Sequence, residues 1–439
     1  MKLHSDTYDS YKKAEGEWSD TIPSEWQERR VKDLFRLVTR AAPANNDYEL
    51  LSLFAGIGVK PRKDMEARGN KASSTDGYWI VKKNDIVVNK LLAWMGSVGI
   101  SEYDGVTSPA YDVLRQVNPD IEPRYYSYLF RTETAKKIFR KNSRGIMDMR
   151  LRLYFDKLGA ITVPLPSIAE QILISNYIDI KTAQIDKKIN LLTRKIELYT
   201  KLRKKIIRDV IFSGLDTQAE TLDTGIIGFD KVPKHWIIKR FKEIFRKTHT
   251  GWTPNTKKDS SYVGENIWIT IGDMSEKFVC NSSNKLSNEA VEESNIPITP
   301  KGSLLFSFKL SVGKVSFAAC DLFTNEAIIS IEKSKNINLD YFYYSLPILL
   351  VLAAKENIYG AKLLNQGLIF NAPLLYPPVD EQEDIVNYLD FRVNAIQDLI
   401  DKVELQIKKQ GELRLTLIND AVMGRIRVNK EIISKGSEI

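Results

Sequence analysis

Residues 164–215 of the chain read PLPSIAEQILISNYIDIKTAQIDKKINLLTRKIELYTKLRKKIIRDVIFSGL. Residues 375–426 repeat the pattern as LYPPVDEQEDIVNYLDFRVNAIQDLIDKVELQIKKQGELRLTLINDAVMGRI. The two stretches align without a gap at an offset of 211, and each opens with prolines and a Glu-Gln pair. Prolines followed by acidic residues favour the start of a helix. An internal repeat of this length indicates how the rest of the chain is organised.

Both copies carry apolar residues at alternating steps of four and three, which is the a/d seam of a coiled coil. No proline follows the opening turn of either copy, so each predicts one helix of about forty residues and about 60 Å. One such helix cannot bury its own apolar stripe, and two copies in one chain have a high effective concentration, so we expect them to pack together. The residues expected at the helix starts and in the seam are Glu170, Gln171, Ile185, Ile189, Leu192, Ile196, Glu381, Gln382, Ile396, Ile400, Val403 and Ile407.

Two alternatives to this pairing exist. Each helix could pair in parallel with a helix of an outside partner. The two stretches could instead be unrelated amphipathic helices in separate cores, although ordinary helices have only about eleven residues.

A second element also occurs twice. The stretch TIPSEWQERRVKDLFR at 21–36 matches KVPKHWIIKRFKEIFR at 231–246, and the match pairs Trp26 with Trp236. Because the tryptophans recur in the same context, we expect them to be core residues and not ligand contacts. In each half, short strands and turns follow, and then an aromatic helix that begins near Tyr125 or Tyr341.

The order is therefore globular region, long helix, globular region, long helix. The composition, 43% hydrophobic and 27% charged, is typical of a globular protein. We expect an α+β fold in which two globular domains are separated by two long helices that pack as an antiparallel coiled coil, with an internal pseudo-two-fold repeat. The expected parts are an N-terminal arm (1–20), a first domain (21–165), a long helix (166–215), a linker (216–230), a second domain (231–376), a long helix (377–426) and a tail (427–439).

The net charge of +8 makes a polyanion the favoured partner. Cys280 and Cys320 stand in unrelated contexts and form no metal or redox motif, which fits a reducing cytosol. No apolar run reaches the length of a membrane span, and MKLHSDTYDSYKKAEGEW has no signal-peptide core. We therefore expect a cytoplasmic protein without membrane contact.

Three sets of motifs together resemble the specificity subunits of Type I restriction-modification systems. They are the proline and Glu-Gln helix starts at Pro166 and Pro377, the P-x-x-W openings at Pro23 and Pro233, and GWTPNTKKDSSYVGENIWITIGDM at 251–274. They span nearly the whole chain after residue 20. Residues 39–46 lack the Thr-Pro signature, which implies a different subtype for the first domain.

The resemblance implies that each globular domain is a target-recognition domain that reads one half of a split sequence in double-stranded DNA. The helices would then set the unread spacer and dock two modification subunits, which carry S-adenosylmethionine and methylate adenine. Restriction or translocase subunits are further expected partners. The chain itself would contain no catalytic residue, cofactor or metal.

Motifs of independent catalysis are missing from the sequence. There is no phosphate-binding P-loop and no H-E-x-x-H, and the chain has only three histidines. The stretch 53–58, LFAGIG, resembles the methyl-donor loop of cytosine-C5 methyltransferases. Those enzymes also need a Pro-Cys nucleophile, and neither cysteine here follows a proline. The alternative for this stretch is a strand end that turns into Lys60 and Pro61.

Loops that combine Lys or Arg with Asn, Ser, Thr or aromatic residues can hold phosphates and reach base edges. A basic run at 201–208 of the first long helix could also face DNA or a partner, or be a solvated helix face. The other reading of the whole chain is a coiled-coil scaffold whose globular domains bind peptides or glycans. The candidate DNA-binding residues are Lys60, Arg62, Lys63, Lys90, Arg144 and Arg150 in the first domain, and Thr250, Trp252, Thr253, Asn255, Lys257, Lys309, Lys314 and Lys362 in the second.

Overall fold

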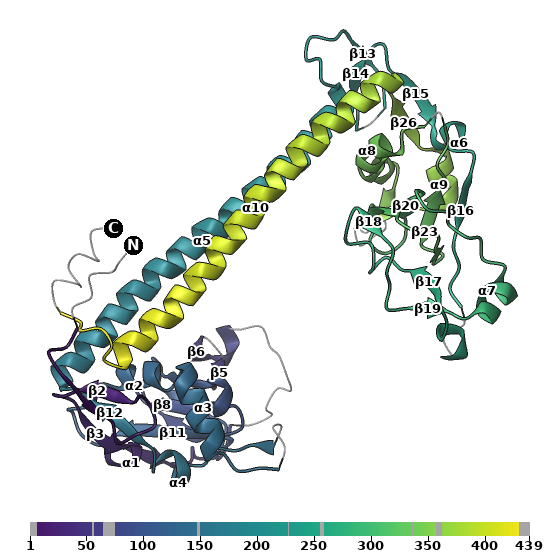
Figure 1. Cartoon of the computed structure of the whole chain (residues 1–439). Coiled ribbons are helices and arrows are strands. Elements are labelled where there is room, and N and C mark those ends of the chain that lie inside the picture. The colour runs from purple at the N-terminus through teal and green to yellow at the C-terminus, as the bar shows by residue number, and fades with distance from the viewer. Residues whose placement is uncertain are drawn as a thin grey trace. The chain divides into compact units, whose positions relative to one another are not determined.

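The computed structural model describes residues 7–54, 57–64, 75–146, 150–226, 228–254, 259–335, 337–356 and 362–429. The chain forms two compact units, residues 1–194 with 403–439 and residues 195–402. Two long helices, α5 (Ile168–Ser213) and α10 (Val379–Val422), each contribute to both units (Figure 1). Each unit also holds one globular α+β domain, so the expected fold class is confirmed.

The start of each long helix is fixed by the glutamine of its Glu-Gln pair. Gln171 is fully buried, its side-chain nitrogen donates to the carbonyl of Pro166 at 2.9 Å, and its side-chain oxygen accepts from the Glu122 N–H at 2.9 Å. Gln382 is also fully buried and donates to the carbonyl of Pro377 at 2.8 Å. Because buried polar groups need partners, each glutamine ties its helix to the proline segment before it.

The ends of the long helices are also equivalent. Gly214 and Gly424 follow the last turns with φ of 67° and 68°, a left-handed conformation that glycine adopts without strain. A Cβ atom at these glycines would lie 3.1 Å from the ring of Trp236 and 2.9 Å from that of Trp26, respectively. Each helix end thus packs against a tryptophan of the repeated opening element, and both tryptophans are buried, as expected.

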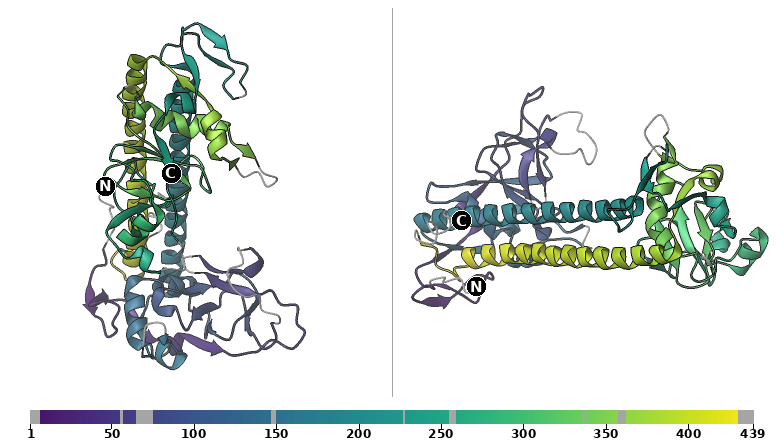
Figure 2. Two further views of the ribbon diagram at one scale, coloured as in Figure 1. Left: turned by 90° about the vertical axis from the view of Figure 1, so that its right-hand side faces the viewer. Right: turned by 90° about the horizontal axis from the view of Figure 1, so that it is seen from above.

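Within each unit the two helices run antiparallel. In the first unit, Ile178 near the start of α5 shares a core with Leu417 near the end of α10. In the second unit, Ile211 near the end of α5 shares a core with Ile385 near the start of α10. Figures 1 and 2 show the helices side by side in both units.

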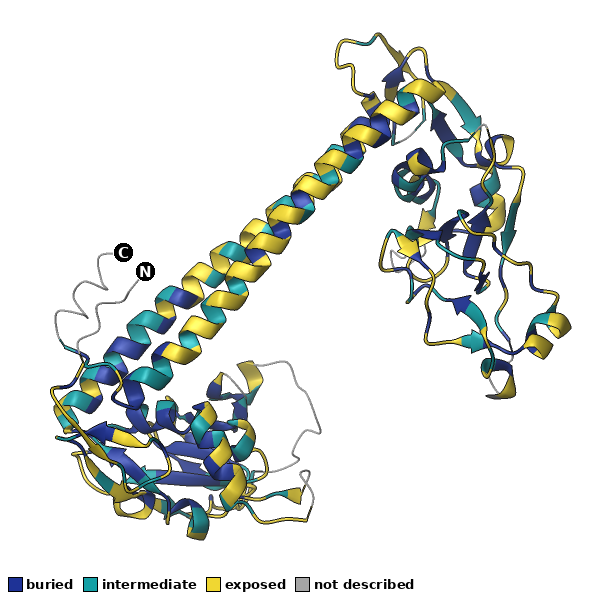
Figure 3. Cartoon of the chain, in the orientation of Figure 1, coloured by how far each residue is buried: buried dark blue, intermediate teal, exposed yellow. Residues whose placement is uncertain are grey.

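Buried, half-buried and exposed positions alternate along both long helices (Figure 3), and every residue of the predicted seam is buried or half-buried. The buried members are Ile185, Ile396, Ile400 and Val403, and the half-buried members are Ile189, Leu192, Ile196 and Ile407.

The first domain is built on an antiparallel sheet in the order β4-β11-β8-β9, and its aromatic core includes Phe35, Tyr126 and Phe130. The domain also contains the two-stranded pairs β5-β6, β7-β10 and β3-β12. The elements are β1 (Tyr11–Lys13), β2 (Thr21–Pro23), β3 (Gln27–Arg30), α1 (Val31–Leu34), β4 (Phe35–Val38), β5 (Leu51–Phe54), β6 (Gly58–Pro61), η1 (Arg62–Asp64), β7 (Trp79–Val81), β8 (Ile86–Asn89), η2 (Ala93–Met95), β9 (Val98–Ile100), β10 (Gly105–Thr107), β11 (Tyr111–Gln116), α2 (Pro123–Leu129), α3 (Glu133–Asn142), α4 (Phe155–Leu158) and β12 (Thr162–Leu165).

The second domain has a sheet in the order β16-β23-β20-β21-β18, in which β18 and β21 are parallel, and a smaller sheet β19-β17-β22. The elements are β13 (Thr221–Asp223), β14 (Lys231–Pro233), β15 (Ile237–Arg240), α6 (Phe241–Ile244), β16 (Thr248–Thr250), η4 (Asp259–Tyr262), β17 (Asn266–Ile269), β18 (Phe278–Val279), β19 (Lys285–Leu286), α7 (Asn288–Ser294), β20 (Leu304–Ser307), β21 (Val315–Ala318), β22 (Phe323–Thr324), β23 (Ile328–Ile331), α8 (Leu339–Leu352), β24 (Lys355–Glu356), β25 (Lys362–Leu363), α9 (Gln366–Asn371) and β26 (Pro373–Tyr376).

The stretches expected to be an arm (1–20) and a linker (216–230) each supply the first strand of a β-hairpin, and the two hairpins are equivalent. Tyr11 pairs with Pro23 between β1 and β2, and Thr221 pairs with Pro233 between β13 and β14. Tyr8 and Trp18 of the first stretch and Phe229 of the second are buried. The repeat therefore begins earlier in each half than the tryptophan motif, because apolar side chains spaced among polar residues anchor these segments.

Each domain is anchored to its long helix through one aspartate. Asp179 of α5 accepts a hydrogen bond from the Tyr128 hydroxyl and pairs with Arg124 at 2.9 Å. The equivalent Asp390 of α10 accepts from the Tyr344 hydroxyl and pairs with Lys277 at 3.2 Å. Burial is the main cause that raises the pKa values of both tyrosines, and the aspartate hydrogen bonds add to it.

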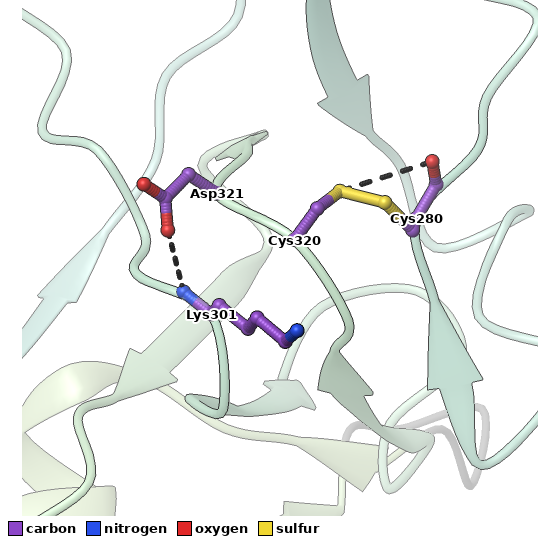
Figure 4. Close-up of a disulfide and its surroundings, with 4 residues drawn as sticks. All are labelled: Cys280, Lys301, Cys320 and Asp321. Atoms are coloured by element: carbon purple, nitrogen blue, oxygen red, sulfur yellow. Dashed lines mark hydrogen bonds between the residues drawn. A yellow bond between two sulfur atoms is a disulfide. The ribbon is translucent and has the colours of Figure 1, made fainter.

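The expectation that the two cysteines are unrelated was wrong. The parallel pairing of β18 with β21 puts Cys280 and Cys320 side by side, with their Cα atoms 5.5 Å apart, and they form a disulfide (Figure 4). Beside it, the Lys301 N–H donates to the Asp321 carboxylate at 2.8 Å. This bond has no local sequence signal, because the cysteines are 40 residues apart and a parallel edge pairing of short strands has no local pattern.

We predict that Gln171→Ala destabilises the protein more than Gln382→Ala. The first change leaves the Glu122 N–H and the Pro166 carbonyl without their partner, whereas the second leaves only the Pro377 carbonyl. At about 1–3 kcal/mol for each stranded group, we expect losses of about 2–6 kcal/mol for Gln171→Ala and about 1–3 kcal/mol for Gln382→Ala. Urea denaturation followed by circular dichroism measures both. Exposed Gln218→Ala is the control, and equal losses for the two buried glutamines would contradict the prediction.

We also predict that reducing the disulfide, or replacing both cysteines by serine, lowers the free energy of unfolding of the second unit by about 2–4 kcal/mol, because the cross-link restrains the unfolded chain. Thermal unfolding with and without a dithiol reductant measures the change. The Cys280→Ser/Cys320→Ser variant is the control, since its melting temperature should not respond to the reductant. A wild-type melting temperature that is equally insensitive would contradict the prediction.

Candidate nucleic-acid interface

Lys60, Arg62 and Lys63 lie together on β6 and η1 of the first domain. Lys60 pairs with Glu102 at 3.1 Å, and that hydrogen bond raises the pKa of Lys60. Lys63 pairs with Glu49 at 2.5 Å. Such surface pairs contribute at most about 1 kcal/mol, so a phosphate can replace either glutamate. The three cations form one basic group, in which Lys63 is exposed and Lys60 and Arg62 are half-buried.

Lys90 and Arg144 come from distant segments that the structure brings together. The Leu153 N–H donates to the Lys90 carbonyl at 2.9 Å. The backbones of Arg144 and Arg152 form an isolated antiparallel β-bridge. Lys90 donates to the Pro109 carbonyl at 2.7 Å and lies 3.5 Å from the buried Asp112. Lys90 is thus held within the domain. Burial raises the pKa of Asp112, and the nearby Lys90 offsets only part of that rise.

Arg144 and Arg150 are more accessible. Arg144 is exposed and pairs with Asp156 at 3.2 Å, while Arg150 is exposed and makes no ion pair among the described residues. Between them, Ile146 is 97% exposed. Sequence reasoning missed Ile146, because an apolar residue near a predicted strand or loop is normally assigned to the core.

Three loops of the second domain are neighbours through backbone hydrogen bonds. The Trp252 N–H donates to the Thr324 carbonyl at 2.9 Å, and the Phe308 N–H donates to the Ala327 carbonyl at 2.9 Å. A Cβ atom at Gly251 would lie 1.7 Å from the Thr324 oxygen, so only glycine permits this approach. We call loops 250–254, 308–314 and 324–327 the second-domain face.

The Thr-Pro motif supplies one side of the second-domain face. The Trp252 side chain is 41% exposed, while its carbonyl accepts from the indole of Trp268 at 3.0 Å. The Thr253 hydroxyl donates to Glu326, and the Thr250 hydroxyl accepts from Gln366 at 3.2 Å. An exposed indole on a fixed backbone can stack on a base or make contacts in a groove of a nucleic acid.

The turn between β20 and β21 supplies the other side of the second-domain face. Lys309 is exposed, with its ammonium 5.7 Å from the centre of the Phe308 ring, while the Lys314 ammonium donates to the Ile271 carbonyl at 3.1 Å. At the tip, Leu310 has a φ of 57° and is 95% exposed. Sequence reasoning missed Leu310 as well, because leucine carries no signal for a left-handed turn.

The remaining candidates do not join the second-domain face. Lys362 lies on the separate hairpin β24-β25 and pairs with Glu356 at 2.6 Å, which lowers the pKa of Glu356. Asn255 and Lys257 lie outside the described residues.

The Glu-Gln residues serve the frame itself. Glu170 accepts from the Tyr8 hydroxyl, and Glu381 accepts from the Trp236 indole at 2.9 Å and lies 2.8 Å from the ring of His235. Together with the hydrogen bonds of the buried glutamines, these contacts attach the start of each long helix to the opening segment of its half of the chain.

Across the described ranges, no cluster of His, Cys, Asp or Glu could hold a metal ion. Within the same ranges, no helix is long and apolar enough to span a membrane. The candidate surfaces of the two domains present exposed cations, the indole of Trp252 and the apolar side chains of Ile146 and Leu310. Cations bind phosphates, and indole and apolar side chains can contact base edges in a groove, so these groups suit a nucleic-acid duplex.

Comparisons with known proteins agree with this assignment. The model of the family described as "Type I restriction modification DNA specificity domain" matches residues 23–197 and 233–409. The MjaIX specificity subunit, a Type I restriction enzyme subunit of Methanocaldococcus jannaschii, is 25% identical over 206 residues. That match covers 44% of this chain and 46% of the relative, so it spans about half the length of the curated protein.

Two solved structures share the fold. One is a chain from a structure of a type I R-M system that addresses complex assembly and conformational transition, with a TM-score of 0.69, 14% identity, and coverage of 92% of this chain and 99% of that one. The other is the HsdS subunit from Thermoanaerobacter tengcongensis, with a TM-score of 0.54, 15% identity, and coverage of 92% and 98%. The family model matches most of the sequence in two copies, so this chain belongs to the family of Type I restriction-modification DNA specificity domains.

Proposed function

We propose that the chain is the non-catalytic DNA-recognition subunit of a Type I restriction-modification complex. Each globular domain reads one half of a split target in double-stranded DNA. The first domain uses the groups around Lys60 and Arg144, and the second uses the second-domain face around Trp252 and Lys309.

One observation carries the proposal: the frame repeats, whereas the two candidate surfaces do not. The hairpins β1-β2 and β13-β14, the strand pairs β3-β12 and β15-β26, and helices α5 and α10 are equivalent. The first domain presents its cations on β6 and η1 and at Arg144 and Arg150, and the second presents an indole and a hairpin tip. Two different surfaces on one repeated frame suit two different half-sites.

The long helices would set the distance between the half-sites. The helix α5 is continuous over 46 residues, or about 70 Å at the usual rise per residue. A rigid connection fixes the phase of two contacts along DNA, because a helical turn of DNA is about 34–36 Å.

Catalysis would come from partner subunits. In this proposal two modification subunits bind the frame, carry S-adenosylmethionine and methylate adenine, and restriction or translocase subunits complete the complex. The chain contributes recognition and holds no cofactor of its own.

The proposal is tested by base-resolved methylation sequencing in a methylation-free host that expresses this chain with the methyltransferase encoded beside it. We expect a split, asymmetric motif methylated on adenine, which disappears when this chain is omitted. No new methylation from a soluble complex would favour the scaffold reading, in which the domains bind peptides or glycans.

We predict that Lys309→Ala weakens DNA binding by the complex about fivefold at 0.15 M salt and reduces the slope of log K against log salt by about 0.9, the loss of one phosphate contact. Binding is measured by fluorescence anisotropy over a salt series. Lys301→Ala is the matched control, because Lys301 is an exposed lysine of the same domain outside the three loops. An unchanged salt slope for Lys309→Ala would remove Lys309 from the interface.

We further predict that one heptad inserted into each of α5 and α10, between the Asp186–Arg414 and Arg203–Gln397 pairs, lengthens the recognised spacer by about 3 base pairs. Seven residues add about 10 Å and preserve the seam. Methylation sequencing reads the spacer directly. The same insertion at 216–220, outside both helices, is the control and should leave the spacer unchanged. A heptad variant that methylates the original motif would refute the spacer role.

A further inference from the structure

The sheets of the two domains share one topology. The order β4-β11-β8-β9 of the first sheet matches β16-β23-β20-β21 of the second, and neighbouring strands are antiparallel at every step. The strands β8 and β20 have four residues each and end at Asn89 and Ser307. The connection from β8 to β9 and the connection from β20 to β21 are therefore equivalent. We call residues 90–97 the first turn and residues 308–314 the second turn.

The first turn folds back onto its own domain. Its middle forms the short helix η2, in which Ala93 is fully buried and Trp94 is half-buried. Helix α3 packs on η2, and the guanidinium of Arg140 lies 5.1 Å from the centre of the Trp94 ring. Leu91 and Leu92 at the start of this turn are consequently only 37% and 44% exposed.

The tip of the second turn stands away from its domain. Leu310 is 95% exposed, and its φ of 57° is a left-handed conformation that is unfavourable for a residue with a Cβ atom. A glycine would adopt this backbone at lower cost, and an exposed side chain gains nothing from burial. The folding of the domain therefore does not account for a leucine at this position, and a bound ligand could.

The second turn is held in place by Ser307, which is fully buried. Its backbone N–H donates to the Lys314 carbonyl, and its carbonyl accepts from the Gly313 N–H, both at 2.9 Å. Its hydroxyl donates to the Ser311 carbonyl at 2.5 Å and accepts from the Lys314 N–H at 2.9 Å. These four hydrogen bonds close the turn around Leu310. Because the backbone is ordered before binding, a contact made by Leu310 costs little conformational entropy.

The surroundings of Leu310 fit a groove of DNA better than the surface of a protein. Lys309 and Ser311 on either side are polar and exposed, so the apolar surface is one side chain wide. A stable protein interface buries about 800 Å² on each partner, which a single leucine cannot supply. A connection between two antiparallel strands can enter the major groove of DNA, which is about 12 Å wide. There Lys309 can contact a phosphate while Leu310 reaches base edges.

The apolar group that a base pair presents in the major groove is the C5-methyl group of thymine. The other groups that distinguish the base pairs are hydrogen-bond donors and acceptors, and a leucine that covered them would leave them without partners. We propose that Leu310 reads a thymine in the half-site of the second domain through contact with its C5-methyl group. The inference rests on the proposed function, to which it adds a specificity-determining residue and the base that this residue recognises.

The test uses the complex of the full chain with the adjacent methyltransferase and the target duplex found by methylation sequencing. Each thymine on both strands of both half-sites is replaced in turn by uracil, which pairs as thymine does and lacks only the C5-methyl group. Affinity is measured by fluorescence anisotropy at one salt concentration. For the wild-type chain, we expect replacement of the thymine that Leu310 contacts to weaken binding about fourfold, the effect of exposing one buried methyl group.

Leu310→Ala should weaken binding to the thymine duplex about fourfold or more, and it should abolish the response to uracil at that one position. Alanine keeps the Cβ atom, so the cost of the left-handed backbone is unchanged and only the apolar contact is lost. Because Leu310 is exposed, the melting temperature should stay the same. Leu92→Ala is the matched control, since both leucines are the third residue after equivalent strands, and it should retain that uracil response.

The outcomes separate this inference from the proposed function. A uracil response that Leu310→Ala leaves unchanged would overturn the role of Leu310 while DNA recognition by the chain still stands. If no uracil replacement weakens binding, the methyl contact is overturned, and a loss of affinity in Leu310→Ala would then point to insertion of the leucine between base pairs, which a fluorescent base analogue detects. A wild-type complex that binds no specific duplex would defeat the proposed function itself.

Discussion

The structure depends on the hydrogen bonds that attach each globular domain to the long helix that follows it. A buried glutamine closes the helix start onto its proline strand, and an aspartate two turns later accepts a tyrosine hydroxyl from the domain. These polar contacts are directional, so they fix the orientation of the domain in a way that apolar packing alone does not. Recognition of DNA at a set position requires such fixed orientation, and the same two contacts occur in both units.

Much of this fold was predictable because its signals are local. The helices follow from heptad spacing and prolines, and the tryptophan motif identified the repeated opening element. The hairpins β1-β2 and β13-β14 were missed because strands of three residues carry no periodicity and their sequences are polar. The disulfide was missed for another reason: it joins parallel neighbours in a sheet whose strand order the sequence does not encode locally.

The sequence predicted which residue types form the candidate interface, but not which of those side chains lack a partner within their own domain. Lys60, Lys63 and Lys90 are cations as expected, but only the tertiary structure shows that each has a partner within its domain. Conversely, Leu310 and Ile146 are apolar neighbours of predicted cations in the sequence, and only the structure shows that they are 95% and 97% exposed and not part of the core. Composition identifies the class of ligand, whereas the fold decides which side chains remain free to meet it.

The internal repeat adds a physical criterion that a single domain lacks. Equivalent positions experience the same backbone and helix environment, so a difference between them reflects what each must bind, and an identity reflects either the frame or a shared partner. Gln171 and Gln382 are identical and buried, which assigns them to the frame. Arg203 and Arg414 are also identical, and each contacts the other long helix, Arg203 through Gln397 at 2.8 Å and Arg414 through Asp186 at 3.7 Å, so both contribute to the frame.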